Sequence, residues 1–87
     1  MHTSNQIQAG YIILTEYSGS KPYKVAINPS QISSICDISC YGGCSARVYM
    51  CGREQPYDTT EAFDEILQLI GEFNRHYTTN NYDVRYI

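Results

Sequence analysis

The spacing of apolar residues changes once along this chain, and the change limits the folds that the chain can adopt. Between residues 11 and 58, short stretches rich in apolar side chains are separated by clusters of Gly, Pro, Asn and Ser. Alternation of apolar and polar residues within such stretches is typical of β-strands. From residue 61 onward the apolar side chains recur every three or four positions, which is the spacing of an amphipathic helix.

Six stretches are predicted to be strands: residues 11–17, 22–28, 31–38, 45–51, 54–58 and 82–87. The first two are joined by a short segment that contains Gly19, so they are expected to form a hairpin. The third follows Asn28-Pro29 and is expected to begin with one helical turn before it extends.

The predicted helix begins after the polar cluster Asp58–Glu61 and is expected to end before Thr78–Asn81. Its apolar stripe consists of Phe63, Ile66, Leu67, Ile70 and Tyr77. Glu61, Asp64 and Glu65 lie near the N-terminal end of the helix, where the helix dipole favours acidic residues. Together with Glu72, further along, they are expected to form the solvated face of the helix.

Leu69 and Phe73 make the apolar stripe wider than one small sheet is expected to cover. A stripe of this width is typical of a buried helix or of a contact between subunits. The last predicted strand could also pair with a second chain through its edge. We therefore expect a homo-oligomer with an interface formed by Leu69, Phe73, Tyr82, Val84 and Tyr86.

Together these elements predict an α+β domain. A small, mostly antiparallel sheet of about four to five strands is expected to pack against one helix and to be followed by a C-terminal strand. The 87 residues suffice for one domain. Residues 1–10 show no periodicity and are expected to be a flexible N-terminal tail, which leaves residues 11–87 as the single domain.

The charge distribution argues against nucleic acids and membranes as partners. The formal net charge is −3, and the six Lys and Arg residues are dispersed along the chain. Binding to phosphate backbones or to anionic lipid surfaces requires a concentration of basic residues. The longest apolar run, Tyr11–Leu14, is far shorter than the ~20 residues of a membrane-spanning helix. The first ten residues do not resemble a secretory signal, so we expect a cytoplasmic protein.

Four cysteines occur in the pattern C-x3-C-x3-C-x6-C, at Cys36, Cys40, Cys44 and Cys51. Three interpretations are open: a zinc site built from all four thiols, a disulfide between Cys40 and Cys44 or between Cys36 and Cys51, or free thiols that pack as small apolar side chains. Successive strand residues point to opposite faces, so four thiols in strands need not converge. The third interpretation is therefore favoured, and no other cofactor is expected.

The sequence contains no enzyme signature that we can identify. Neither His2 nor His76 is near a cysteine in sequence, so a Cys–His pair is not indicated. Asp64 and Glu65 are adjacent on the predicted helix and diverge in direction, which is poor geometry for acid–base catalysis. The Gly42-Gly43 pair lacks the lysine and the strand–loop–helix context of a phosphate-binding loop.

Nine tyrosines accompany only two phenylalanines and no tryptophan. Tyrosine combines an apolar ring with a polar end, which suits half-buried positions and binding surfaces. Tyrosine rings could stack on a nucleotide base, while arginines could pair with its phosphates. The candidate residues for such a ligand are Tyr41, Arg47, Tyr49, Arg53 and Tyr57.

Three segments resemble those of a known family in their order and spacing. Ile12–Thr15 is similar to an opening "IxLT" strand, Ile27–Ile35 to an "xNPxxIxxI" segment, and Glu61–Ile66, followed by Ile70, to an "ESxDEVxxxI" helix start. Together they resemble the small FlbD/SwrD-like family, named for flagellar and swarming motility proteins and common among phages and prophages. The resemblance covers about residues 11–73, and it implies a fold rather than catalytic residues, since none are known for the family.

The chain also departs from that family. The capping serine of the family helix corresponds to Ala62, so the cap is expected to come from Asp58–Thr60. The chain gains Tyr41–Gly43 and the four cysteines in the preceding hairpin, and it continues for about fourteen residues beyond the family helix. These additions favour a phage-type member of the family.

The leading hypothesis is a small non-enzymatic protein-interaction module. It would be phage-encoded, act as a homo-oligomer, and inhibit a host or defence protein in the host cytoplasm. One alternative is a protein that binds and sequesters a nucleotide-like small molecule. Another is an accessory protein of flagellar or swarming motility.

Overall fold

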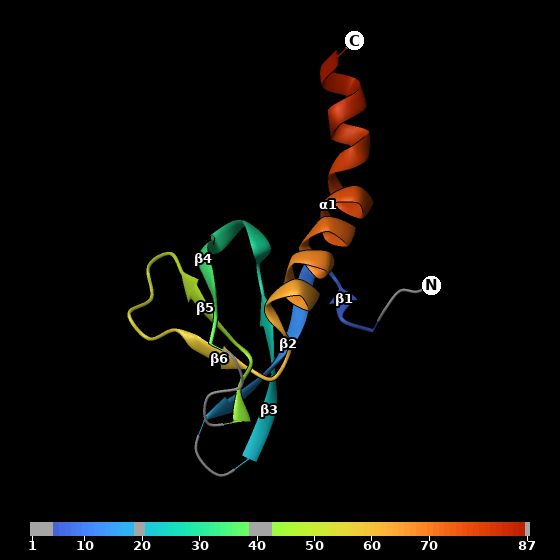
Figure 1. The fold of residues 1–87 in the computed structure, drawn as a ribbon. Helices are drawn as coiled ribbons and strands as arrows, with labels where there is room; N and C mark the ends of the chain where they lie inside the picture. Colours follow the sequence, from blue (N-terminus) through green and yellow to red (C-terminus); the bar gives the residue numbers. More distant parts are fainter. Residues whose placement is uncertain (1–4, 19–20, 39–42, 87) are drawn as a thin grey trace.

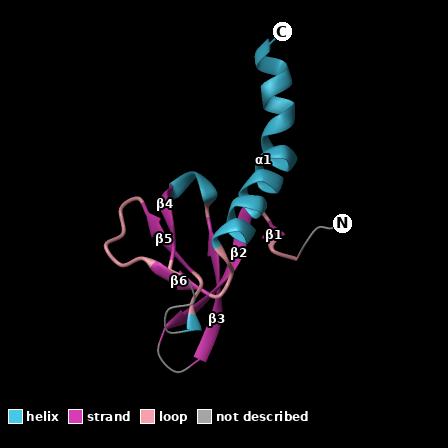
Figure 2. Cartoon of the chain, viewed as in Figure 1, coloured by secondary structure: helices cyan, strands magenta, loops and turns pink. Residues whose placement is uncertain are grey.

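The computed structural model describes residues 5–18, 21–38 and 43–86, with side chains described as far as residue 77 apart from that of Ser18. Within these ranges the chain forms a six-stranded antiparallel sheet followed by one helix (Figures 1 and 2). The α+β class predicted from the sequence is therefore confirmed. No helix within these ranges is long and apolar enough to cross a membrane.

The elements in chain order are β1 (Ile7–Gln8), β2 (Tyr11–Ser18), β3 (Lys21–Ile27), the 3₁₀ turn η1 (Pro29–Gln31), β4 (Ile32–Asp37), β5 (Ala46–Met50), β6 (Tyr57–Thr59) and α1 (Phe63–Tyr86). Strand β2 pairs with β3 from Ile12 to Ser18. Its other edge pairs with β1 near the start and with β6 at Glu16. Strand β6 also pairs with β5, which pairs with β4. The short β6 thus joins the β2–β3 hairpin to the β4–β5 hairpin (Figure 1).

The hydrophobic core lies between the sheet and the first turns of α1. Alternate residues of the strands face this core and are almost completely buried, as the alternation predicts. The helix contributes two residues one turn apart. The buried apolar cluster comprises Ile12, Leu14, Ile27, Ala46, Val48, Ile66 and Leu69.

Leu69 belongs to this core, so its predicted role in an interface with a second chain is wrong. Its side chain is 5% exposed, because the helix turns it toward the sheet. Leu67, which the sequence placed in the apolar stripe, is instead 46% exposed. Phe73 is half-buried against the core, and its ring centroid lies 4.6 Å from that of Tyr77.

The edge of β2 between β1 and β6 is completed by hydrogen bonds from outside the regular strand ladder. The N–H of Ile13 donates to the carbonyl of Gln6 (2.7 Å), and Gln6 Nε2 donates to the carbonyl of Ile13 (3.0 Å). The N–H of Thr15 donates to Glu61 Oε1 (2.8 Å), while the N–H of Thr60 donates to the carbonyl of Thr15 (3.0 Å). Glu61 is 8% exposed, so its predicted place on a solvated helix face is wrong.

The start of α1 is capped differently from the prediction. Glu65 Oε1 accepts a hydrogen bond from the N–H of Ala62 at 3.3 Å, which is one half of a capping box. The predicted cap from Asp58–Thr60 is wrong because α1 begins only at Phe63, and the side chains of Asp58 and Thr59 have other partners. Asp58 pairs with Arg47, and the Thr59 hydroxyl donates to the carbonyl of Glu61 at 3.0 Å. Ala62 itself has no side-chain oxygen to cap the first turn.

Replacing Ala62 with serine is therefore expected to stabilise the protein. The serine hydroxyl can accept a hydrogen bond from an N–H of the first helical turn and complete the capping box. The expected gain is about 1 kcal/mol in the free energy of unfolding, or about 4–8 °C in Tm for a domain of this size. Thermal unfolding followed by circular dichroism measures it. Ala26→Ser, at an exposed position of β3, is the control and should change little. An unchanged Tm for Ala62→Ser would contradict the proposed cap.

Helix α1 continues to Tyr86, so the predicted C-terminal strand at residues 82–87 is wrong. The run Thr78–Asn81, which suggested a break, contains neither Gly nor Pro. Threonine and asparagine cost only about 0.5–0.7 kcal/mol each in a helix relative to alanine, so they weaken the helix without ending it. The last turns of α1 extend beyond the sheet (Figure 1). The side chains of Tyr82, Val84 and Tyr86 lie outside the described residues.

Part of the N-terminal segment forms regular structure that was not predicted. Residues 1–10 were expected to be a flexible tail, but Ile7–Gln8 form β1 and pair with the start of β2. The N–H of Gly10 donates to Tyr77 Oη at 3.2 Å, which ties this turn to α1. A strand of two residues is too short to show alternation, so the sequence pattern did not reveal it.

Candidate functional site

Strands β2, β3, β5 and β6 and the β5–β6 loop form a surface hollow of about 620 Å³. This volume lies within the roughly 300–1,000 Å³ typical of binding pockets. The residues that line it are Glu16, Tyr23, Arg47, Tyr49, Arg53, Gln55, Pro56 and Asp58. The hollow therefore combines two acids, two arginines and two tyrosines.

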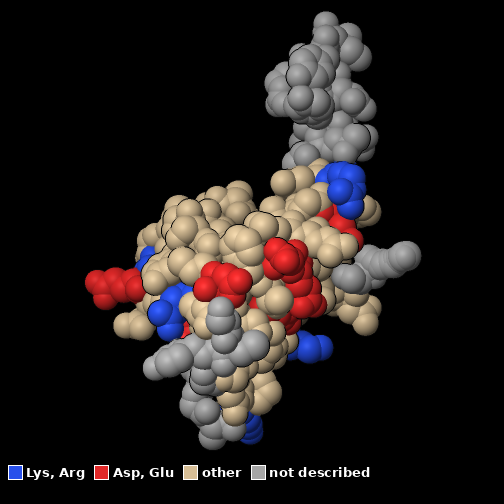
Figure 3. All heavy atoms as spheres, in the orientation of Figure 1, with Lys and Arg blue, Asp and Glu red and all other residues tan. Residues whose placement is uncertain are grey.

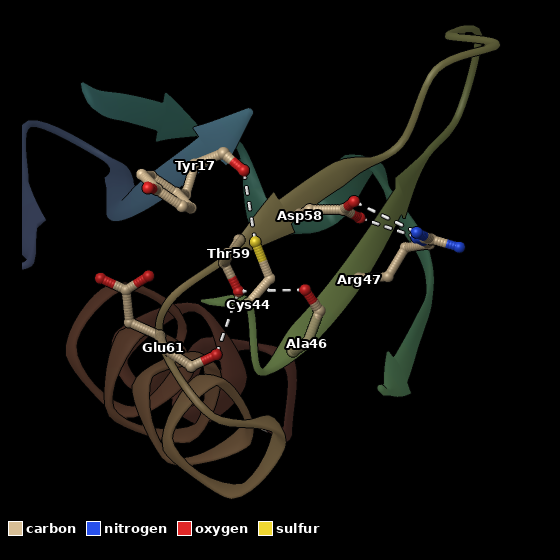
Figure 4. Close-up of polar contacts among 7 residues, drawn as sticks. All are labelled: Tyr17, Cys44, Ala46, Arg47, Asp58, Thr59 and Glu61. Carbon is tan, nitrogen blue, oxygen red and sulfur yellow. Dashed lines mark hydrogen bonds and ion pairs between the residues drawn. The ribbon is translucent and has the colours of Figure 1, made fainter. Parts of the chain in front are cut away.

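Arg47 and Asp58 form an ion pair across neighbouring strands β5 and β6. Arg47 Nε lies 2.7 Å from Asp58 Oδ1, and Nη2 lies 3.1 Å from Oδ2, so the pairing is bidentate (Figure 4). The hydrogen bond and the charge of Asp58, with a smaller contribution from Tyr49, raise the pKa of Arg47 above its ordinary value. Arg47 is thus permanently charged, and Asp58 balances that charge.

Three of the five predicted ligand-binding residues meet in the hollow. Arg47, Tyr49 and Arg53 all line it. Tyr57 does not line the hollow but contacts a residue that does, because the guanidinium carbon of Arg53 lies 3.9 Å from the centroid of the Tyr57 ring. That distance is typical of a cation–π contact. Tyr41 lies outside the described residues.

The acid at the bottom of the hollow, Glu16, was not identified from the sequence. Its residue is only 6% exposed, and Tyr23 Oη donates a hydrogen bond to its Oε1 at 2.7 Å. The alternation of residues in β2 does indicate that Glu16 faces the core. Ile12 and Leu14 occupy the core-facing positions of β2, and Glu16 is the next residue on that face. A carboxyl group at a core-facing position is uncommon and often functional.

Some of the remaining acids lie on another part of the surface. Figure 3 shows acidic side chains around the start of α1, while the Lys and Arg side chains on that face are dispersed. No continuous basic stripe is seen on the face drawn there.

The described cysteines do not converge on one point. Cys36, Cys44 and Cys51 are free thiols, as the favoured interpretation expects, and the alternative Cys36–Cys51 disulfide is absent. Cys44 precedes β5 and Cys51 follows it, which places them near opposite ends of that strand. Within the described part of the chain, no three His, Cys, Asp or Glu side chains are grouped to hold a metal. Cys36, Cys44 and Cys51 are therefore not placed to bind one zinc ion together, which argues against the alternative of a four-thiol site. Cys40 lies outside the described residues.

Cys44 is expected to react more slowly with iodoacetamide than Cys36 and Cys51. Cys44 is buried, and its Sγ contacts the carbonyl oxygen of Tyr17 at 3.2 Å (Figure 4). Burial, followed by the charge of Asp58, raises the pKa of the Cys44 thiol and so lowers its thiolate fraction. Peptide mass spectrometry after timed alkylation at pH 8 measures the order of reaction. In denaturant the difference should disappear. Equal rates in the native protein would contradict the buried position.

Comparison with known proteins identifies no relative of this chain. No family model matches the chain, and no curated protein or solved structure matches it either. The resemblance to the FlbD/SwrD-like family therefore rests on the three sequence segments and stays a prediction. Any function has to be inferred from the chemistry of the hollow.

Proposed function

We propose that this protein is a small non-enzymatic module that binds a protein partner through the hollow of β2, β3, β5 and β6. The observation that carries the proposal is the grouping of partly exposed Tyr23, Tyr49 and Arg53 around one concave site. Tyrosine and arginine are the residue types enriched in the energetically dominant centres of protein interfaces. Tyr23 and Tyr49 are on strands, which hold such side chains in place before a partner binds.

The chemistry of the hollow favours a protein over a nucleotide-like ligand. Arg47 is already paired with Asp58, so a phosphate would have to displace this carboxylate before it could use both arginines. Glu16 adds a second carboxyl group that opposes an anionic ligand. A partner surface that carries both basic and acidic groups need not displace Asp58 from Arg47, and its basic groups would be attracted to Glu16.

The proposed setting follows from the family resemblance. If the chain is a phage-type member of that family, its partner is a host or defence protein in the bacterial cytoplasm. The same resemblance supports, less specifically, a role as a motility accessory protein. Both settings use the same kind of site, a protein-binding surface.

Self-association through α1 is a further part of the proposal. The 24 residues of α1 span about 36 Å, and its last turns lie beyond the sheet (Figure 1). Isolated helical turns are only marginally stable in water, so packing of a second copy along α1 would stabilise this helix. Native mass spectrometry of the full chain should then show a multiple of 9.9 kDa.

Affinity capture with matched variants tests the proposed function. The immobilised wild-type chain and the variant Tyr49→Ala are exposed to the same bacterial lysate. Lys24→Ala, on β3 outside the residues that line the hollow, is the control. We expect a protein that is retained by the wild type and the control and lost from Tyr49→Ala. The proposal is contradicted if all three variants retain the same proteins.

A further inference from the structure

The carboxyl group of Glu16 is buried with fewer hydrogen bonds than it can accept. Its Oε1 accepts one hydrogen bond, from Tyr23 Oη at 2.7 Å. Among the described residues, the structure shows no donor to its Oε2. A carboxylate has about four acceptor positions, and buried polar groups are normally satisfied by protein or water. Glu16 therefore has acceptor capacity left, in a residue that is 6% exposed and lines the hollow.

The charges around Glu16 leave it as the acid available to a ligand. Asp58, the other acid of the hollow, is held by both nitrogens of the bidentate pair with Arg47. Arg53 belongs to the β5–β6 loop, and its guanidinium group lies over the ring of Tyr57. The hollow thus has an acid at its most buried position and a base on its loop.

The walls next to Glu16 are aromatic and partly open to solvent. Tyr23 is 51% exposed and Tyr49 is 36% exposed. Aromatic faces attract ammonium and guanidinium groups, and they pack well against the aliphatic stems of lysine and arginine. An apolar ligand would leave Glu16 Oε2 without a donor, and an anionic ligand would be repelled by the carboxylate.

We infer that the hollow binds a lysine or arginine side chain of the protein partner. The cationic group of that side chain donates to Glu16, and its stem lies against Tyr23 and Tyr49. An acidic residue next to it on the partner pairs with Arg53. The inference rests on the proposed function and specifies the partner as a segment that carries adjacent basic and acidic residues.

Short peptides test this chemistry directly. The probes are acetyl-Gly-Lys-Asp-Gly-amide, its arginine analogue, and an analogue with norleucine, which replaces the lysine by an uncharged side chain of similar shape. Each is titrated into the labelled full chain and followed by NMR. The lysine and arginine peptides should shift the resonances of the Glu16 carboxyl carbon and of the Tyr23 and Tyr49 rings, with a Kd on the order of 1 mM. Equal binding of the norleucine peptide would overturn the inference.

A matched pair of variants tests the role of Glu16. Glu16→Gln keeps the volume and an acceptor for the Tyr23 hydroxyl but removes the charge, so it should bind the lysine peptide about tenfold more weakly. Glu54→Gln removes an exposed acid of the β5–β6 loop that does not line the hollow, and its Kd should stay within about twofold of wild type. Thermal unfolding checks that both variants are folded. An unchanged Kd for Glu16→Gln would contradict the inference.

The failure of this inference can be told apart from the failure of the proposed function. A partner that is lost from Tyr49→Ala but retained by Glu16→Gln would leave the binding module in place and exclude the basic side chain. Lysine-peptide binding that depends on Glu16, together with capture that does not depend on Tyr49, would contradict the protein-binding role of the hollow.

Discussion

Replacing Glu61 with alanine is expected to lower the free energy of unfolding by about 2–3 kcal/mol. The carboxylate of Glu61 accepts hydrogen bonds from the N–H of Thr15 at 2.8 Å and from Gln6 Nε2 at 3.3 Å. It fills the gap on the edge of β2 between β1 and β6. Alanine would leave the Thr15 N–H, in a partly buried position, without this acceptor, which carries a desolvation cost. Urea unfolding followed by circular dichroism measures the loss.

Two further variants separate the hydrogen bond from a general effect of losing an acid. Glu61→Gln retains one oxygen that can accept from Thr15, so its expected loss is smaller, about 1 kcal/mol. Glu54→Ala removes an exposed acid and should stay within about 0.5 kcal/mol of wild type. If Glu61→Ala were as stable as Glu54→Ala, Glu61 would not hold the edge of β2.

Much of the sheet could be predicted from the sequence because alternation and turn residues are local signals. Strands β2 and β3, with the hairpin between them, lie within one residue of the predicted segments. Strand β5 falls inside a predicted segment, and β6 overlaps the segment 54–58 but ends one residue beyond it. The order of the strands could not be predicted in the same way. Alternation shows which face of a strand is buried, but not which strand is its neighbour. The single pairing between β2 and β6, at Glu16 and Thr59, is a tertiary contact of this kind.

The ends of the chain were mispredicted for a related reason. The period-two alternation of residues 82–87 favours a strand, but a strand also needs an edge to pair with. Helical hydrogen bonds are internal to the segment, so α1 can continue to Tyr86 without a partner strand. Strand β1 shows the opposite effect. Its two residues carry no strand pattern of their own, but they form a strand by pairing with the edge of β2.

The candidate site was partly predictable. Arg47 and Tyr49 are two residues apart on one strand, so alternation places them on the same face, and Arg53 follows in the next loop. The two acids were missed because each was interpreted locally. Asp58 was assigned to the helix cap, while it pairs with Arg47 across the sheet. Glu16 falls within the predicted strand 11–17, and that local pattern assigns it no role, although it continues the buried face of β2.

Replacing Ile66 with alanine is expected to lower the free energy of unfolding by about 3 kcal/mol, whereas Leu67→Ala should cost at most about 0.5 kcal/mol. The sequence pattern placed both residues in one apolar stripe. The structure separates them, since Ile66 is 0% exposed and Leu67 is 46% exposed. Truncation of Ile66 creates a cavity between α1 and the sheet. Truncation of Leu67 removes half-exposed atoms and introduces the best helix former.

Urea unfolding of the two variants under the same conditions compares them. If Ile66→Ala fails to fold, Ile66→Val removes one methylene and should still cost about 1 kcal/mol. Equal losses at positions 66 and 67 would mean that α1 is rotated relative to the sheet, because adjacent helical residues are about 100° apart around the axis. A larger loss at 67 than at 66 would place Leu67 in the core and leave Leu69 free for a second chain. The matched pair therefore tests which face of α1 the monomer uses and which face it leaves for a partner.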